Sequence, residues 1–496
     1  MPEDRRQLKR DLTLIFTLGL LYRIILLIFF PVPYGNDAAG RLYFRDSILT
    51  WHWLPFTQAI VYLTYWLTNS VWVVRLIFAV AGSLAAVAFA FYLQALASRR
   101  AAWIGGTLFT INAHAVYLSL MPYQEIVFLG LLFGSLAFFI LEESAPLRAR
   151  YFLIGSLLYG LACLTRYEAW FILPALLGVR IWRAWGKNNF AGAAAKSLIG
   201  LCWGPALWLF SNWLHWGSAT ALLFHRADRS FYAWDPHGDV LRMIKYVGMM
   251  LYWLARFGSP LVLFALPGFW LVWKNRQKMI AVLSPLLILL ALMLIFLFFV
   301  ASKDFATANR FAMFPLAVVL IFTALGVDDM MTRASKASPP LLKNLARPVP
   351  EIAIAVFLAL GLLVYGAAPV VQANRLPVHR EPYEIANFLK ANLAHAESAV
   401  IVAASYEGEI PMPYQRVFGQ LDFDKARLLC SFLIEQQTIA NIESFVRRRS
   451  VRYIVVFNDD QPRENNDAVF AQLVLDPRNN IKTAFANNAA TIYKLY

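Results

Sequence analysis

Residues 151–183, YFLIGSLLYGLACLTRYEAWFILPALLGVRIWR, decide the fold class. Two apolar runs flank the polar turn at residues 165–168. Basic residues stand at both ends, with Arg148 and Arg150 before the segment and Arg183 at its close. Because Lys and Arg collect in the cytoplasmic loops of membrane proteins, both ends favour the cytoplasm. The segment therefore predicts two membrane crossings. Each run is short for a span of about 20 residues, so we expect the turn to dip toward the membrane from the outer side.

The composition of the whole chain agrees with a membrane protein. The 496 residues are 59% hydrophobic and only 15% charged, with a mean hydropathy of +0.54, whereas a soluble domain needs a more charged surface. The net charge of +15 fits either nucleic-acid binding or basic cytoplasmic loops, and the alternation of basic loops favours the second reading. We predict about eleven spans, near residues 13–31, 71–95, 102–119, 124–141, 151–164, 168–183, 197–214, 249–273, 279–300, 311–327 and 351–370. The N-terminus is then cytoplasmic.

The first loop on the outer side, residues 32–70, is long and amphipathic. Its sequence predicts a helix over 38–49 and a second one over 56–67, separated by Trp51-His52-Trp53-Leu54-Pro55. The second helix is rich in Trp and Tyr, which is typical of a helix lying along the membrane interface.

Residues 372–496 predict a separate, soluble, extracytoplasmic α/β domain. Residues 384–393 have a helical pattern, and residues 432–449 favour further helices. Short apolar runs at 399–403 and 453–457 and a last one at 491–495 predict strands. We therefore divide the chain into a transmembrane domain over 1–371, which includes the loop 32–70, and this α/β domain.

Charged residues that could carry chemistry gather on the predicted outer side, although that topology was derived from other residues. Carboxylates there can accept a proton from a hydroxyl, and cations can bind a phosphate and stabilise it as it leaves. Carboxylates and cations together would fit a site that binds a lipid-anchored phosphate at the depth of the lipid headgroups. These candidates are Asp37, Glu125, Arg166, Glu168, Lys303, Asp304 and Arg310.

Structural explanations stand beside the chemical ones. Asp37 could cap the helix that follows it, and Glu125 could be placed by the dipole of its own helix. Arg166 and Glu168 could form a local pair that reaches the surface. Arg310 could be a topology anchor or a contact to lipid headgroups.

A divalent metal is possible, but no cofactor is predicted with certainty. The loop between residues 215 and 242 carries metal-ligand residue types without tight spacing, so a solvated loop is the favoured interpretation. These residues are His225, Asp228, Asp235, His237 and Asp239.

Four motifs, in this order, resemble those of GT-C glycosyltransferases, including the protein O-mannosyltransferase-like and lipid A aminoarabinose transferase-like families. They are Asn36-Asp37 with Trp53-Leu54-Pro55-Phe56, then Tyr123-Gln124-Glu125, then LACLTRYEAW at 161–170, and NRFAMFP at 309–315. Two features differ. Many relatives have Asp-Glu where this chain has Asp37-Ala38, and the Trp-Trp-Asp-Tyr-Gly signature of oligosaccharyltransferases is absent, so transfer to asparagine is not expected.

The resemblance implies a membrane glycosyltransferase of the cell envelope. It would move a sugar from a polyprenyl- or dolichyl-phosphate donor to a lipid, glycan or protein acceptor at the outer face, with inversion. Asp37 would be the base and Glu125 a second catalytic candidate. The partners are then the donor, the acceptor and membrane lipids, with no nucleic acid, in a prokaryotic plasma (inner) membrane. Substrate-binding residues would be Arg166, Tyr167, Glu168, Lys303 and Arg310.

Two other classes of function remain open from the sequence. A transporter or flippase of lipid-linked glycans would place charges along the interior of several helices. In this chain the charges gather at one face. A membrane anchor or sensor that displays the C-terminal domain would need only one or two spans, and it gives no reason for an acidic outer loop.

Overall fold

The computed structural model contains two compact units. One unit comprises residues 1–26, 49–58 and 77–369, and the other comprises 27–48, 59–76 and 370–496. The residues that the structure describes are 2–30, 36–50, 53–144, 148–185, 190–220, 251–254, 260–274, 312–337, 377–402, 427–430, 445–457, 481–487 and 490–495, with isolated residues between 244 and 290 and between 371 and 422.

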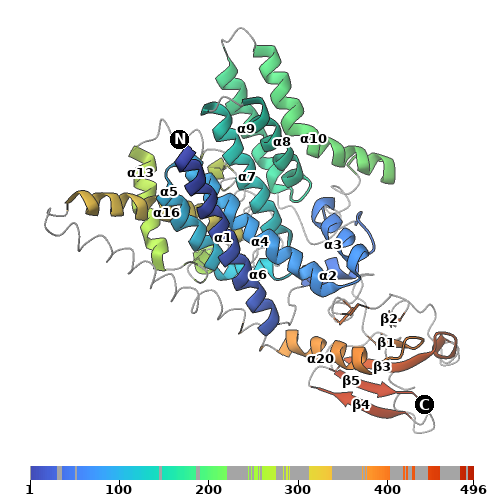
Figure 1. The fold of residues 1–496 in the computed structure, drawn as a ribbon. Helices are drawn as coiled ribbons and strands as arrows, with labels where there is room; N and C mark the ends of the chain where they lie inside the picture. Colours follow the sequence, from blue (N-terminus) through green and yellow to red (C-terminus); the bar gives the residue numbers. More distant parts are fainter. Residues whose placement is uncertain are drawn as a thin grey trace. The chain divides into compact units, whose positions relative to one another are not determined.

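The first unit is helical (Figure 1). Five of the described helices are long and apolar enough to cross a membrane, and they coincide with the predicted spans 13–31, 71–95, 124–141, 197–214 and 311–327. The predicted spans 279–300 and 351–370 lie largely or wholly outside the described residues, so the number of eleven stays a prediction. The elements are α1 (Pro2–Phe29), α4 (Val71–Leu96), α5 (Arg99–Ile111), α6 (Ala113–Ser119), α7 (Gln124–Ser144), α8 (Arg148–Cys163), α9 (Glu168–Ala184), α10 (Phe190–Trp216), η2 (Pro260–Phe264), α13 (Ala265–Lys274) and α16 (Met313–Ala337).

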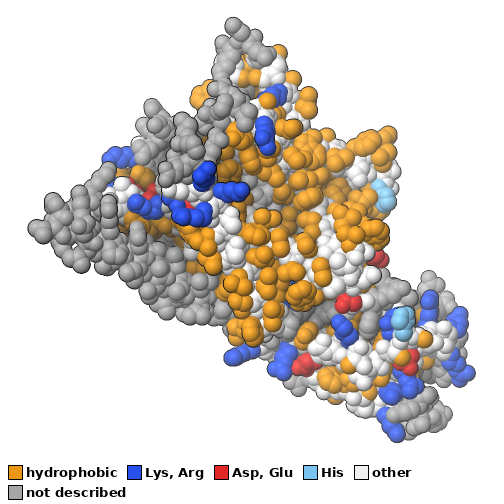
Figure 2. All heavy atoms as spheres, in the orientation of Figure 1, with side chains coloured by type: hydrophobic (Ala, Val, Ile, Leu, Met, Phe, Trp, Pro, Cys, Tyr) orange, Lys and Arg blue, Asp and Glu red, His pale blue; other side chains and the backbone are white. Residues whose placement is uncertain are grey.

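The surface of these helices is apolar. Figure 2 shows hydrophobic side chains covering much of the visible face of the helices. Leu18, Leu21 and Ile25 of α1 are exposed, and so are Phe210 and Trp213 of α10. A patch of this kind is unfavourable in water but matches the hydrocarbon of a bilayer. The helices therefore form a membrane-spanning domain, as the sequence predicts.

The hairpin that the sequence predicts over 151–183 is present as α8 and α9. Both helices pack against α10, and α8 also packs against α7. Glycines bring the backbones of α8 and α10 together, because a Cβ atom at Gly204 would lie 2.4 Å from the carbonyl oxygen of Gly160. Small residues allow such close helix packing in membranes.

Ion pairs mark the two ends of α7. Glu125, near its start, contacts Arg166 in the hairpin turn. Glu142, near its other end, contacts Arg180 at 2.9 Å and Lys196 at 3.8 Å. At a rise of about 1.5 Å per residue the two carboxylates lie about 25 Å apart. The turn and the basic end of the hairpin are therefore at opposite ends of the helices, as expected for two crossings.

One predicted span is divided. The sequence predicts a single helix over 102–119, whereas α5 ends at Ile111 and α6 begins at Ala113. Asn112 stands between them, and its side-chain oxygen accepts hydrogen bonds from the backbone N–H groups of His114 (3.0 Å) and Ala115 (3.1 Å). The side chain thereby caps α6 and replaces the hydrogen bonds that the break removes.

The second unit contains a five-stranded sheet with the strand order β2-β1-β3-β5-β4. The strand β1 pairs in parallel with β2 and β3, while β5 pairs antiparallel with β3 and β4. The predicted strands at 399–403, 453–457 and 491–495 are confirmed. The strands are β1 (Ser398–Val402), β2 (Leu428–Cys430), β3 (Val451–Phe457), β4 (Lys482–Ala486) and β5 (Ala490–Lys494).

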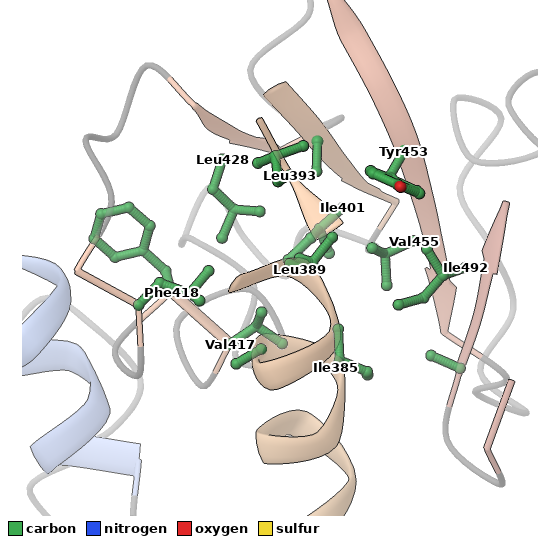
Figure 3. Packing of buried hydrophobic residues seen from close by; sticks show 14 of the residues in the cluster. Ile385, Leu389, Leu393, Ile401, Val417, Phe418, Leu428, Tyr453, Val455 and Ile492 are labelled. Carbon is green, nitrogen blue, oxygen red and sulfur yellow. The ribbon is translucent and has the colours of Figure 1, made fainter. Parts of the chain in front are cut away.

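Helix α20 (Pro377–Asn392) covers one face of this sheet. Its residues Ile385 and Leu389 point at Ile401, Val455 and Ile492 of the strands (Figure 3). The predicted helix over 384–393 is confirmed, although it begins earlier in the structure. Of the predicted helices over 432–449, only residues 445–449 are described, and 445–448 are helical.

Two further helices, α2 (Asn36–Tyr43) and α3 (Pro55–Thr68), belong to the predicted first outer loop. The expectation of a helix over 56–67 is confirmed by α3. Leu63, Trp66 and Leu67 of α3 are exposed, which fits the interfacial position that the sequence predicts. The other helix, expected over 38–49, ends at Tyr43, and Phe44 and the residues after it form a turn.

Candidate functional site

A buried ionic cluster occupies the turn between α8 and α9. The guanidinium of Arg166 donates from Nη1 to Oε1 of Glu125 and from Nε (2.9 Å) and Nη2 to Oε1 of Glu168. The Arg166 side chain is only 6% exposed, and those of Glu125 and Glu168 are 5% and 18% exposed. Glu125 lies in the first turn of α7 and Glu168 begins α9. We call these three residues the Arg166 cluster.

Hydrogen bonds on both sides of the turn fix its shape. The hydroxyl of Thr165 donates to the carbonyl of Leu161 at 2.8 Å and so provides a partner for a carbonyl near the end of α8. The buried hydroxyl of Tyr159 donates to the carbonyl of Ala169 at 2.6 Å and so joins α8 to α9. The indole of Trp170 donates to the carbonyl of Cys163 at 2.8 Å. The turn is therefore rigid on both of its arms.

A small apolar cluster supports the same turn. Leu54, Leu164 and Trp208 are buried together, and Tyr167 packs against them. The backbone N–H of Phe56, at the start of α3, donates to the carbonyl of Leu164 at 3.0 Å. The segment Trp53-Leu54-Pro55-Phe56, which the sequence singles out, therefore contacts the hairpin turn directly.

The chemistry of the Arg166 cluster follows from its charges. Two carboxylates share one guanidinium, so the ionised cluster carries a net negative charge in a buried position. Charges at such a depth are costly unless they are paired and hydrogen-bonded. Here the carboxylates of two helices are held in fixed positions, which is what a site needs to orient hydroxyl groups. The local Arg166–Glu168 pair is present, but it is buried instead of reaching the surface, and Glu125 joins it from a distant part of the sequence.

Of the predicted site residues outside the Arg166 cluster and Tyr167, the structure describes only Asp37. Asp37 belongs to the second unit and is half-buried in the first turn of α2. A carboxylate is favoured there by the helix dipole, so a structural role stands beside the catalytic one. Lys303, Asp304 and Arg310 lie outside the described residues, as do the five possible metal ligands between His225 and Asp239.

The metal hypothesis gains no support from the part of the chain that the structure describes. In that part, no three His, Cys, Asp or Glu side chains are grouped as metal ligands. Both glutamates of the Arg166 cluster are engaged by the guanidinium.

Among the described residues, four buried arginines were not singled out from the sequence, namely Arg23, Arg41, Arg45 and Arg75. Arg23 of α1 is fully buried and donates to the hydroxyl of Ser119 at 2.7 Å and to the carbonyl of Gly19 at 3.1 Å. Its signal in the sequence was a single arginine inside the apolar run 13–31. An ionisable residue within a span is by default a candidate for function.

This architecture is similar to that of solved protein structures. No family model matches the sequence, and no curated protein matches it. The structure is similar to ArnT from Cupriavidus metallidurans bound to undecaprenyl phosphate, with a TM-score of 0.61, 12% identity and 97% of each chain covered. The apo state of that protein gives 0.58 at 13% identity, also over 97% of each chain.

A second similar structure is the oligosaccharyltransferase from Archaeoglobus fulgidus in complex with zinc and sulfate. Its TM-score is 0.53 at 14% identity, over 89% of this chain and 68% of that chain. Both neighbours have the GT-C fold. At such low identities the likeness concerns the fold. This chain therefore has the GT-C fold, as its motifs indicate.

Proposed function

We propose that the protein is a membrane glycosyltransferase that takes its sugar from a polyprenyl- or dolichyl-phosphate donor. The observation that carries the proposal is the buried Arg166 cluster, set in the hairpin turn of a GT-C fold. The fold is similar, over 97% of each chain, to that of a protein with bound undecaprenyl phosphate. This similarity supports the proposal of a lipid-phosphate donor. Fixed carboxylates at the ends of apolar helices support a site for a polar group at that depth.

In this proposal Asp37 is the base. Its carboxylate takes the proton of an acceptor hydroxyl as that oxygen forms a bond to the anomeric carbon of the sugar. The bond from that carbon to the phosphate oxygen breaks on the opposite face, so the configuration inverts. The products are the glycosylated acceptor and the lipid phosphate, with the proton on Asp37.

The remaining residues bind the substrates. Lys303 and Arg310 hold the phosphate, whose developing charge they stabilise. Glu125, Glu168 and Tyr167 orient polar groups of the sugar or acceptor. Arg166 remains a phosphate ligand in the proposal, and it would have to share its guanidinium with the two carboxylates that already engage it.

The test is Asp37→Asn in the purified full-length protein, incubated with a panel of radiolabelled polyprenyl-phosphate sugars. Removing a general base typically lowers the rate by about 10²- to 10⁴-fold, whereas Asn caps a helix about as well as Asp. We expect a folded protein with transfer nearly abolished. The control is Asp329→Asn, which removes a carboxylate whose described partner is the exposed Arg333. If Asp37→Asn turned over as fast as the wild type, Asp37 would not be the base, and only its role at the N-terminal end of α2 would remain.

The alternative function is a transporter or flippase of lipid-linked glycans. One observation favours it, namely the fully buried Arg23 within a membrane helix, since transporters place charges inside their helices. Proteoliposomes with a fluorescent lipid-linked glycan distinguish the two functions. Movement of the glycan between leaflets without transfer of its sugar would support the alternative.

A further inference from the structure

The C-terminal domain and the helix that carries Asp37 form one packed body. Both belong to the second unit, and Tyr43, the last residue of α2, is buried in the same apolar cluster as Ile385 and Ile401. The ring of Tyr43 meets that of Phe418 edge-on, with 5.2 Å between the centroids. Phe418 is itself 1% exposed within this cluster (Figure 3).

Arg45 links the turn after α2 to the same domain. Its guanidinium lies over the ring of Phe418 (4.5 Å) and over the ring of Tyr65 in α3 (4.2 Å). Its Nη1 donates to the carbonyl of Leu421 at 2.7 Å, and the residue is 3% exposed. A planar cation between two aromatic rings, with a hydrogen bond that fixes its direction, defines one position for the chain around it.

Asp422 makes the next contact. Its Oδ1 accepts a hydrogen bond from the backbone N–H of Val71, the first residue of α4, at 2.7 Å. Its other oxygen lies 3.6 Å from Nζ of Lys390 in α20. A carboxylate is favoured at a helix N-terminus, where it satisfies an N–H group. The C-terminal domain thereby contacts α2 through Phe418 and the first residue of α4 through Asp422, and Arg45 links it to Tyr65 of α3.

We infer that the C-terminal domain positions Asp37 for the reaction, with Arg45 and Phe418 as the positioning residues. The inference rests on the proposed function. Asp37 lies six residues before Tyr43 on the single short helix α2, so an anchor at the end of α2 fixes the direction in which its first turn projects. A helix of this length is not stable alone in water and depends on the packing of its end.

The first measurement is structural and does not depend on activity. Hydrogen exchange of the peptide covering residues 36–43 is compared in the full-length wild type and in Arg45→Ala. We expect about tenfold faster exchange or more in the variant, because a buried charge-assisted hydrogen bond is lost. Arg45→Lys keeps the charge and is expected to be intermediate. The matched control is Arg380→Ala, which removes an exposed arginine paired with Glu384 in α20 of the same domain.

The second measurement is the transfer reaction. A displaced base is expected to lower kcat by about 10- to 100-fold, with an unchanged KM for the donor and a smaller loss in Arg45→Lys. A merely destabilised protein would instead lose active fraction, which exchange of the other helices would reveal. Unchanged kcat in Arg45→Ala, or unchanged exchange of residues 36–43, overturns this inference and leaves the proposed function standing. Absence of transfer by the wild type overturns the proposed function, and the inference with it.

Discussion

At the scale of single residues, the main feature is that Arg166 is held by two carboxylates. One of them, Glu168, is two residues away, and the other, Glu125, comes from a different helix. The guanidinium is buried, so its charge depends on both partners. A buried ion pair adds little net stability over apolar packing, but removing one partner leaves a buried charge alone.

Arg166→Gln is therefore expected to be strongly destabilising. It leaves two buried carboxylates without their cation, and breaking a buried pair costs about 3–5 kcal/mol. The control is Arg333→Gln, which removes an exposed partner of Asp329 in α16 and should cost about 0–1 kcal/mol. Unfolding in a denaturing detergent series measures both. Equal stability of Arg166→Gln and Arg333→Gln would mean that the Arg166 cluster does not hold the turn.

At the scale of elements, glycines set how closely the membrane helices approach. Helix α16 touches α13 and the preceding η2 backbone to backbone. A Cβ atom at Gly268 of α13 would lie 1.8 Å from the carbonyl oxygen of Phe322, and one at Gly326 of α16 would lie 2.0 Å from that of Phe264 in η2. A backbone oxygen cannot move away from an added Cβ atom as the end of a flexible side chain can. Such contacts are typical of helix pairs in membranes, where small residues replace the hydrophobic effect as the cause of association.

Gly268→Ala is expected to force α13 away from α16. Overpacking of this kind costs about 1–3 kcal/mol. Gly178→Ala in α9 is the matched control, because no atom lies within 4 Å of its added Cβ, and alanine favours a helix by about 1 kcal/mol over glycine. Size-exclusion profiles after a series of heating steps measure the surviving folded fraction. The close approach would be disproved if both alanine variants survived heating equally.

At the scale of the whole molecule, ion pairs join three segments whose basic residues set the predicted orientation. Arg99 at the start of α5 pairs with Asp11 of α1, and Arg100 lies 3.7 Å from Asp328 near the end of α16. These residues come from three loops or termini that the sequence assigns to the cytoplasm. Their contacts place them at one end of the helices of the first unit, as the positive-inside rule requires.

Orientation is tested by fusing reporters after residue 371. With a cytoplasmic N-terminus and an odd number of spans, alkaline phosphatase fused there should be active and green fluorescent protein should be dark. The physical reason is that the basic loops resist transfer across the membrane. Fusions after Arg100 report the opposite side and serve as the control. A fluorescent fusion with inactive phosphatase at residue 371 would contradict the topology.

Much of the fold and part of the site followed from local sequence. The turn 165–168 was expected because basic residues bracket two apolar runs, and the Arg166–Glu168 pair lies within that turn. The short strand β2 and the strand β4 were missed, because three residues carry too little pattern and β4 (KTAFA) is exposed apart from Phe485. The break at Asn112 was missed because the residues around it are apolar enough for one span.

Local sequence patterns were enough to predict the membrane class, the hairpin and the α/β nature of the tail, because hydrophobic periodicity and basic loops act over short distances along the chain. Only the tertiary structure decided that Glu125 joins Arg166, that Arg45 lies between Tyr65 and Phe418, and that Tyr43 enters the core of the C-terminal domain. These contacts join residues far apart in the chain. Which partners meet depends on packing and burial, and no local pattern records them.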